Sequence, residues 1–114
     1  MNCSAQEAFT LFFNVWRDDK TLVLVKVVDP RQAQERCTVS DTFPSQGSIR
    51  LKPESEESDR SLKFSGATFS FEDFRGTSPP AGVTRRWLCH LRADFPDGKS
   101  VLFSEPIPGM EDAA

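Results

Sequence analysis

The chain has 114 residues, a length typical of one domain that can bury a hydrophobic core without disulfide staples. Hydrophobic residues make up 38% and charged residues 27% of it, a balance that excludes intrinsic disorder as the default state. The formal net charge of −3 leaves no surplus of Lys and Arg for broad binding to nucleic-acid phosphates. We therefore expect one globular domain over residues 1–114 that does not bind nucleic acid.

The cysteines and the apolar segments indicate the cellular setting. Cys3, Cys37 and Cys89 are odd in number and scattered, which is typical neither of a disulfide framework nor of a zinc site. No basic segment followed by an apolar one begins the chain, so we expect no signal peptide. The longest apolar run, TLVLVKVV, is too short to cross a bilayer. These features predict a cytoplasmic protein with reduced thiols, without cofactor, metal or membrane insertion.

The first segment, residues 5–16, fits two kinds of element. Its Phe, Thr, Val and Trp residues favour a strand, which would form a hairpin with the apolar residues 21–29. Ser4 and Glu7, however, have the spacing of a helix capping box. We favour the strand because the following apolar run offers a partner, and the helix stays as the alternative. The residues that would form one apolar stripe on that helix are Ala5, Phe9, Phe12, Phe13 and Trp16.

The middle of the chain predicts three further stretches of strand. Residues 36–43 and 47–53 alternate apolar with polar side chains, as a strand with one buried face does. Residues 61–74 change parity at Gly66, which predicts a bulge or tight bend there. Residues 30–36 could form a short helical turn.

A second hairpin, over residues 84–105, has the clearest pattern in the sequence. Pro96 fits the first corner of a tight turn, and Gly98 supplies the positive φ that closes it. Counting outward from this turn gives a register in which apolar residues meet on one face. The predicted pairs are Ala93 with Val101, Arg92 with Leu102, Leu91 with Phe103, and His90 with Ser104.

Two loops and a tail complete the organisation. Residues 53–61 form an acidic loop without apolar side chains, and residues 75–84 form a loop rich in Pro and Gly. Residues 107–114 look like a flexible tail. About seven or eight short strands with frequent turn signals predict an all-β fold, either an antiparallel sandwich or a closed barrel.

One face of the second hairpin carries a candidate binding site. Arg86, His90 and Arg92 share the outward parity, and Arg85 lies close to them at the end of the loop. Arginine forks suit a carboxylate or a phosphate, so these residues could orient an acidic ligand. The alternative is a solvated strand face whose charges prevent edge-to-edge aggregation.

The opposite parity argues against catalysis. It places Trp87 and Cys89 in the core with Leu91, on the other face of the strand from His90. A nucleophilic Cys–His pair needs both side chains on one side, within hydrogen-bond reach. We therefore expect no enzyme active site.

The functional prediction is a non-catalytic protein-interaction module, acting as an accessory subunit or adaptor, with a protein partner or a second copy as its ligand. Apolar residues on both faces of the first hairpin could form its interface, and these are Phe12, Trp16, Val23 and Val25. The alternative function is a small barrel that binds an apolar or anionic small molecule through the arginines and histidine above.

Overall fold

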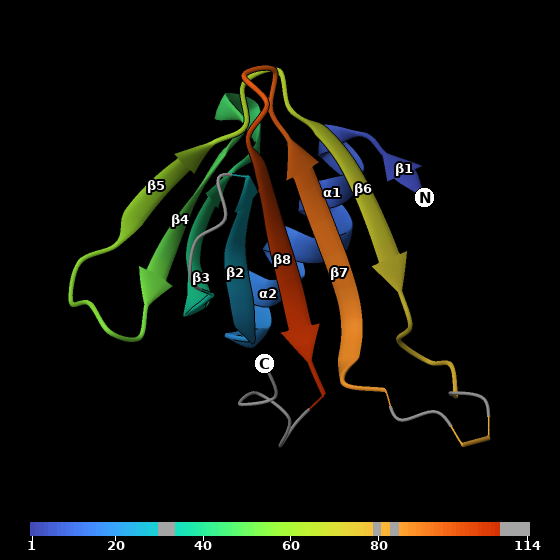
Figure 1. The fold of residues 1–114 in the computed structure, drawn as a ribbon. Helices are drawn as coiled ribbons and strands as arrows, with labels where there is room; N and C mark the ends of the chain where they lie inside the picture. The colour runs from blue at the N-terminus through green and yellow to red at the C-terminus, as the bar shows by residue number, and fades with distance from the viewer. Residues whose placement is uncertain (30–33, 79–80, 83–84, 108–114) are drawn as a thin grey trace.

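A computed structural model of the chain describes residues 1–29, 34–78, 81–82 and 85–107. These residues form one eight-stranded antiparallel sheet that curls around a helical segment (Figure 1). The strand order is β1-β6-β7-β8-β2-β3-β4-β5. The all-β prediction is thus confirmed in its main part. Because β1 and β5 are the two ends of that order, the described residues form an open sheet and no closed barrel.

The strands differ in length, and the two at the edges are short. Each bound follows from the backbone hydrogen bonds of the sheet. The strands are β1 (Asn2–Cys3), β2 (Leu22–Asp29), β3 (Glu35–Phe43), β4 (Ser48–Pro53), β5 (Arg60–Lys63), β6 (Thr68–Asp73), β7 (Trp87–Asp94) and β8 (Ser100–Pro106). A single 3-10 turn, Pro44–Gln46, connects β3 to β4.

Residues 5–19 form a helix in three parts, α1 (Ala5–Ala8), the π-helical turn η1 (Phe9–Phe13) and α2 (Asn14–Asp19). The helix begins with a capping box: the backbone N–H of Glu7 donates to Ser4 Oγ, and that of Ser4 donates to Glu7 Oε1, both at 3.1 Å. It ends at Lys20, whose φ of 53° is left-handed. Our preferred prediction of a strand for residues 5–16 is therefore wrong, and the helical alternative is correct.

The physical reason is the spacing of the aromatic residues. Phe9, Phe12, Phe13 and Trp16 recur at helical intervals, and all four are at most 3% exposed. A helix places them together against the concave face of the sheet, which a strand would not do. The preference of these residue types for strands was the weaker signal, because tertiary burial outweighs intrinsic propensity.

The second hairpin follows its predicted register. The pairs His90 with Ser104 and Leu91 with Phe103 both occur, and the turn closes with a 2.8 Å bond from the N–H of Phe95 to the carbonyl of Lys99. Gly98 has a φ of 92°, as the turn requires. The wrong neighbour was predicted for β2, which pairs with β3 and β8 instead of with residues 5–16.

A β-bulge changes the start of β7. Trp87 pairs with Pro106 and Cys89 with Glu105, so two steps along β7 correspond to one step along β8. This extra residue turns Trp87 to the same face as His90, and the two rings lie 5.3 Å apart. The prediction that Trp87 lies in the core beside Leu91 is therefore wrong. Cys89 does lie in the core, as predicted.

The alternation predicted for the middle strands is confirmed in β4, whereas in β3 a register shift between Val39 and Asp41 buries Thr42 and leaves Phe43 half-buried. Ile49 and Leu51 of β4 are buried, and the predicted bend at Gly66 is the turn between β5 and β6. Gly66 has a φ of 72°, and a Cβ there would lie 2.9 Å from Pro96 Cγ, so the two turns at this end of the sheet pack closely. The proposed helical turn over residues 30–36 lies partly outside the described residues, and Glu35–Arg36 belong to β3.

Candidate functional site

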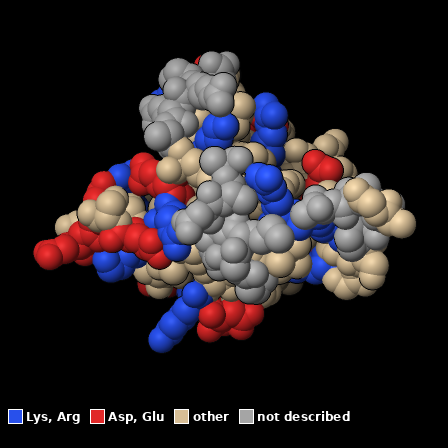
Figure 2. Space-filling model, turned by 60° about the horizontal axis from the view of Figure 1, so that its bottom comes forward, with Lys and Arg blue, Asp and Glu red and all other residues tan. Residues whose placement is uncertain are grey.

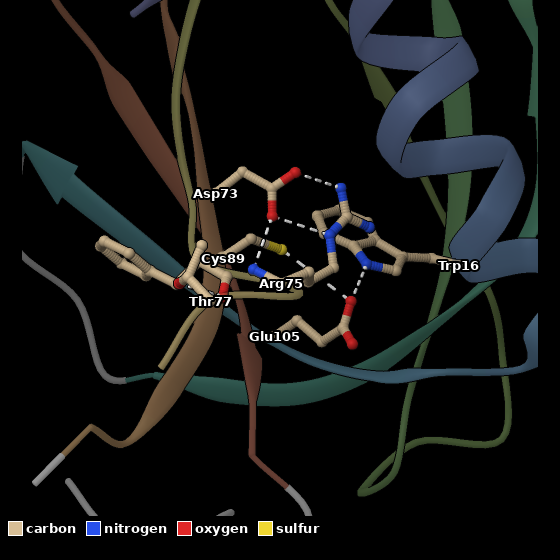
Figure 3. Close-up of polar contacts among 7 residues, drawn as sticks. Trp16, Asp73, Arg75, Thr77, Cys89 and Glu105 are labelled. Carbon is tan, nitrogen blue, oxygen red and sulfur yellow. Dashed lines mark hydrogen bonds and ion pairs between the residues drawn. The ribbon is translucent and has the colours of Figure 1, made fainter. Parts of the chain in front are cut away.

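The concave face holds a polar cluster where the C-terminal half of the helix meets β8 (Figure 3). The indole N–H of Trp16 donates to Glu105 Oε1 at 2.7 Å. The thiol of Cys89 donates to the same oxygen at 3.9 Å. Trp16 and Cys89 are both fully buried, so this carboxylate satisfies two donors that would otherwise lack a partner.

An ion pair between Arg75 and Asp73 completes this cluster on the side of β6. Arg75 binds Asp73 through two bonds, Nε to Oδ1 at 2.9 Å and a terminal nitrogen to Oδ2 at 2.8 Å. Its guanidinium also lies 5.1 Å from the ring centre of Phe12. The guanidinium beside Asp73 lowers the pKa of that carboxyl below its usual value. Sequence reasoning missed this cluster, because its members come together only through the curl of the sheet.

The chemistry of the cluster is that of a structural contact. Burial, reinforced by the negative charge of Glu105, raises the pKa of the Cys89 thiol to about 12. A thiol with that pKa stays protonated at neutral pH and is a poor nucleophile. Cys89 also points to the opposite face of β7 from His90, as predicted, so the two do not form a catalytic pair.

The outer face of the sheet contains the predicted row on β7. His90 Nδ1 lies 2.7 Å from Ser104 Oγ, and the imidazole packs against Trp87 and Phe74. Burial lowers the pKa of His90, and the nearby carboxylate of Glu72 partly opposes that effect. A broad hollow of about 640 Å³ lies over this row, and its walls include Met1, Ser70, Glu72, His90, Arg92 and Leu102.

The predicted arginines do not converge on one point of that hollow. Arg92 binds Asp94 at 2.8 Å and Ser100 at 3.2 Å, so its fork is already occupied. Arg85 donates to the carbonyls of Phe74 and Thr77 and lies over the Phe74 ring, which holds the start of the loop after β6. Arg86 is exposed and does not line the hollow. Of the four residues proposed to bind an acidic ligand, His90 and Arg92 alone line it.

The predicted interface residues lie inside the molecule. Phe12, Trp16 and Val23 are 0% exposed, and Val25 is half-buried. They are covered because residues 5–16 fold as a helix that this same chain packs against its own sheet. Phe12, Trp16 and Val23 therefore form the core and are not available to a partner, whereas Val25 packs at the edge of the core.

An apolar cavity next to β5 was not predicted. It lies on the concave side of the sheet, is lined by strand residues and not by the helix, and has a volume of about 140 Å³. We call it the β5 cavity. Its apolar walls are Val25, Val27, Cys37, Leu51, Leu62 and Val101. A neighbouring hollow shares three of these residues, and its other lining residues are Phe95 and the charged Lys63, Asp97 and Lys99.

Charged residues line one rim of the β5 cavity. Arg60 pairs with Glu35 at 2.9 Å and with Glu56. The second oxygen of Glu35 is buried and has no hydrogen-bond partner among the described residues. Burial and the nearby carboxylate of Glu35 raise the pKa of the Cys37 thiol in the cavity wall to about 11. The cavity thus combines apolar walls with one unsatisfied acceptor.

No family model, curated protein or solved structure matches this chain. Within the described ranges, no helix has the length and apolarity to span a bilayer. Figure 2 shows Lys, Arg, Asp and Glu interspersed on one end of the molecule, without a broad surface of a single sign.

Proposed function

We propose that this chain is a non-catalytic protein-interaction module, a subunit or adaptor of a larger assembly, that receives an extended segment of its partner along β5. The observation that carries the proposal is the β5 cavity beside an open sheet edge. In β-strand addition, main-chain hydrogen bonds give affinity and pockets for alternate side chains give specificity. Both requirements are met at the same place.

The backbone of β5 is arranged to accept such a segment. Phe64 donates to the carbonyl of Gly47 at 2.9 Å, and bonded pairs alternate with non-bonded pairs along an antiparallel ladder. Leu62 and Arg60 are then bonded to β4, while Ser61 and Lys63 direct their N–H and C=O groups to the open edge. Within the described ranges, no strand pairs with that edge.

Selection from a random-peptide display library tests this function. We expect enriched peptides with alternating apolar residues that lose binding to a Ser61→Pro variant, because proline removes the N–H at the open edge without touching the bonds to β4. Ser61→Ala keeps the N–H and should bind the same peptides. A library that yields no peptides, or peptides indifferent to Ser61→Pro, would reject the proposal.

A second candidate function rests on the outer hollow. Its volume of about 640 Å³ suits a small molecule, and His90 in its wall could bind an acidic group there, whereas Arg92 is already engaged by Asp94 and Ser100. Titration with mono- and dicarboxylates and with nucleotides should quench the fluorescence of Trp87, which touches His90, and should leave a Trp87→Phe variant unchanged. A flat response in the wild type would reject this candidate.

A further inference from the structure

We draw no further inference here: the strongest candidate, the open edge of β5 with the apolar β5 cavity beside it, belongs to the site already described, and nothing in the described part of the structure shows which partner occupies it.

Discussion

The indole of Trp16 donates a 2.7 Å hydrogen bond to Glu105, and this contact joins the end of the helix to β8 across 89 residues of sequence. The donor is fully buried and the acceptor is a carboxylate, which places the bond among the stronger ones in proteins. It fixes the helix against the concave face, and it accounts for the position of a half-buried carboxylate on that face.

Loss of the indole donor should destabilise the fold. Trp16→Phe keeps an aromatic ring but leaves Glu105 without its main partner, so we expect the free energy of unfolding in urea to fall by about 1.5–3 kcal/mol. Glu105→Gln retains an oxygen that can accept the bond and should cost less. A loss below about 0.5 kcal/mol for Trp16→Phe would show that the bond contributes little in solution.

Because residues 5–19 form a helix, Phe13 and Leu11 should differ in their contribution to stability. In a strand, residues two apart would share one face. Phe13 is 0% exposed and Leu11 is 41% exposed, although both lie in the same helical turn. Phe13→Ala should lower the free energy of unfolding by about 3–5 kcal/mol. Leu11→Ala should change it by about 0.5 kcal/mol or less. Similar losses at both positions, measured by urea denaturation, would contradict the packing described above.

The cysteines should react in a defined order. The raised thiol pKa values, about 12 for Cys89 and about 11 for Cys37, combine with burial to protect both from alkylation. Cys3 is partly exposed, and its pKa is raised as well, so it should react slowly but first. Iodoacetamide labelling followed by mass spectrometry should find Cys3 alone modified in the native protein and all three modified in urea.

The same thiols set a stability limit at high pH. Their pKa is higher in the folded protein than the ordinary value of 9.0, so above pH 9 the unfolded chain loses protons that the folded chain keeps. Stability is therefore retained below pH 9 and should decline as the pH rises toward 11 and 12. Cys89→Ala should flatten this decline. An unchanged slope in that variant would assign the decline to other groups.

His90 should make stability depend on pH in the opposite direction, with a loss as the pH falls below neutrality. Burial lowers its pKa below the ordinary 6.5, so at mildly acid pH the unfolded chain binds a proton that the folded chain does not. The contribution to stability is complete above pH 6.5 and is lost as the pH falls below it. Urea denaturation of wild type and His90→Gln between neutral and mildly acid pH should show a smaller change in the variant. The lowered pKa values of Asp73 and Asp94 act in a separate, more acid range.

Local sequence patterns were sufficient to predict strand pairing where one strand is joined to the next by a tight turn. The hairpin of β7 and β8 could be predicted because Pro96 and Gly98 mark its turn and the alternation on both sides fits a single register. The bulge that reorients Trp87 has no glycine or proline on β7, and its one marker is Pro106 on the partner strand, which pairs with Trp87. The sequence does not show that these two residues meet, so the effect of the bulge on the outer face could not be predicted.

Features that depend on the curl of the sheet could not be predicted. The β5 cavity brings together side chains from β2, β3, β4, β5 and β8, whose sequence positions span residues 25–101. The candidate interface residue Trp16 was assigned to the surface because the helix and its burial were not foreseen. On β7, the predicted placement of His90 and Arg92 on one face agrees with the structure, but the contacts of Arg92 with Asp94 and Ser100 could be seen only in three dimensions.

The central place of β8 has a consequence for how this chain folds as it is synthesised. β8 lies between β7 and β2, yet it follows both of them, and every other strand, along the chain. Before Ser100–Pro106 emerge from the ribosome, β2 lacks one of its two neighbouring strands, and the Trp16 indole lacks the carboxylate of Glu105 that accepts its hydrogen bond. The nascent polypeptide then has two sheet fragments, β1 with β6 and β7 and β2 with β3 to β5, whose facing edges stay open until β8 is added between them.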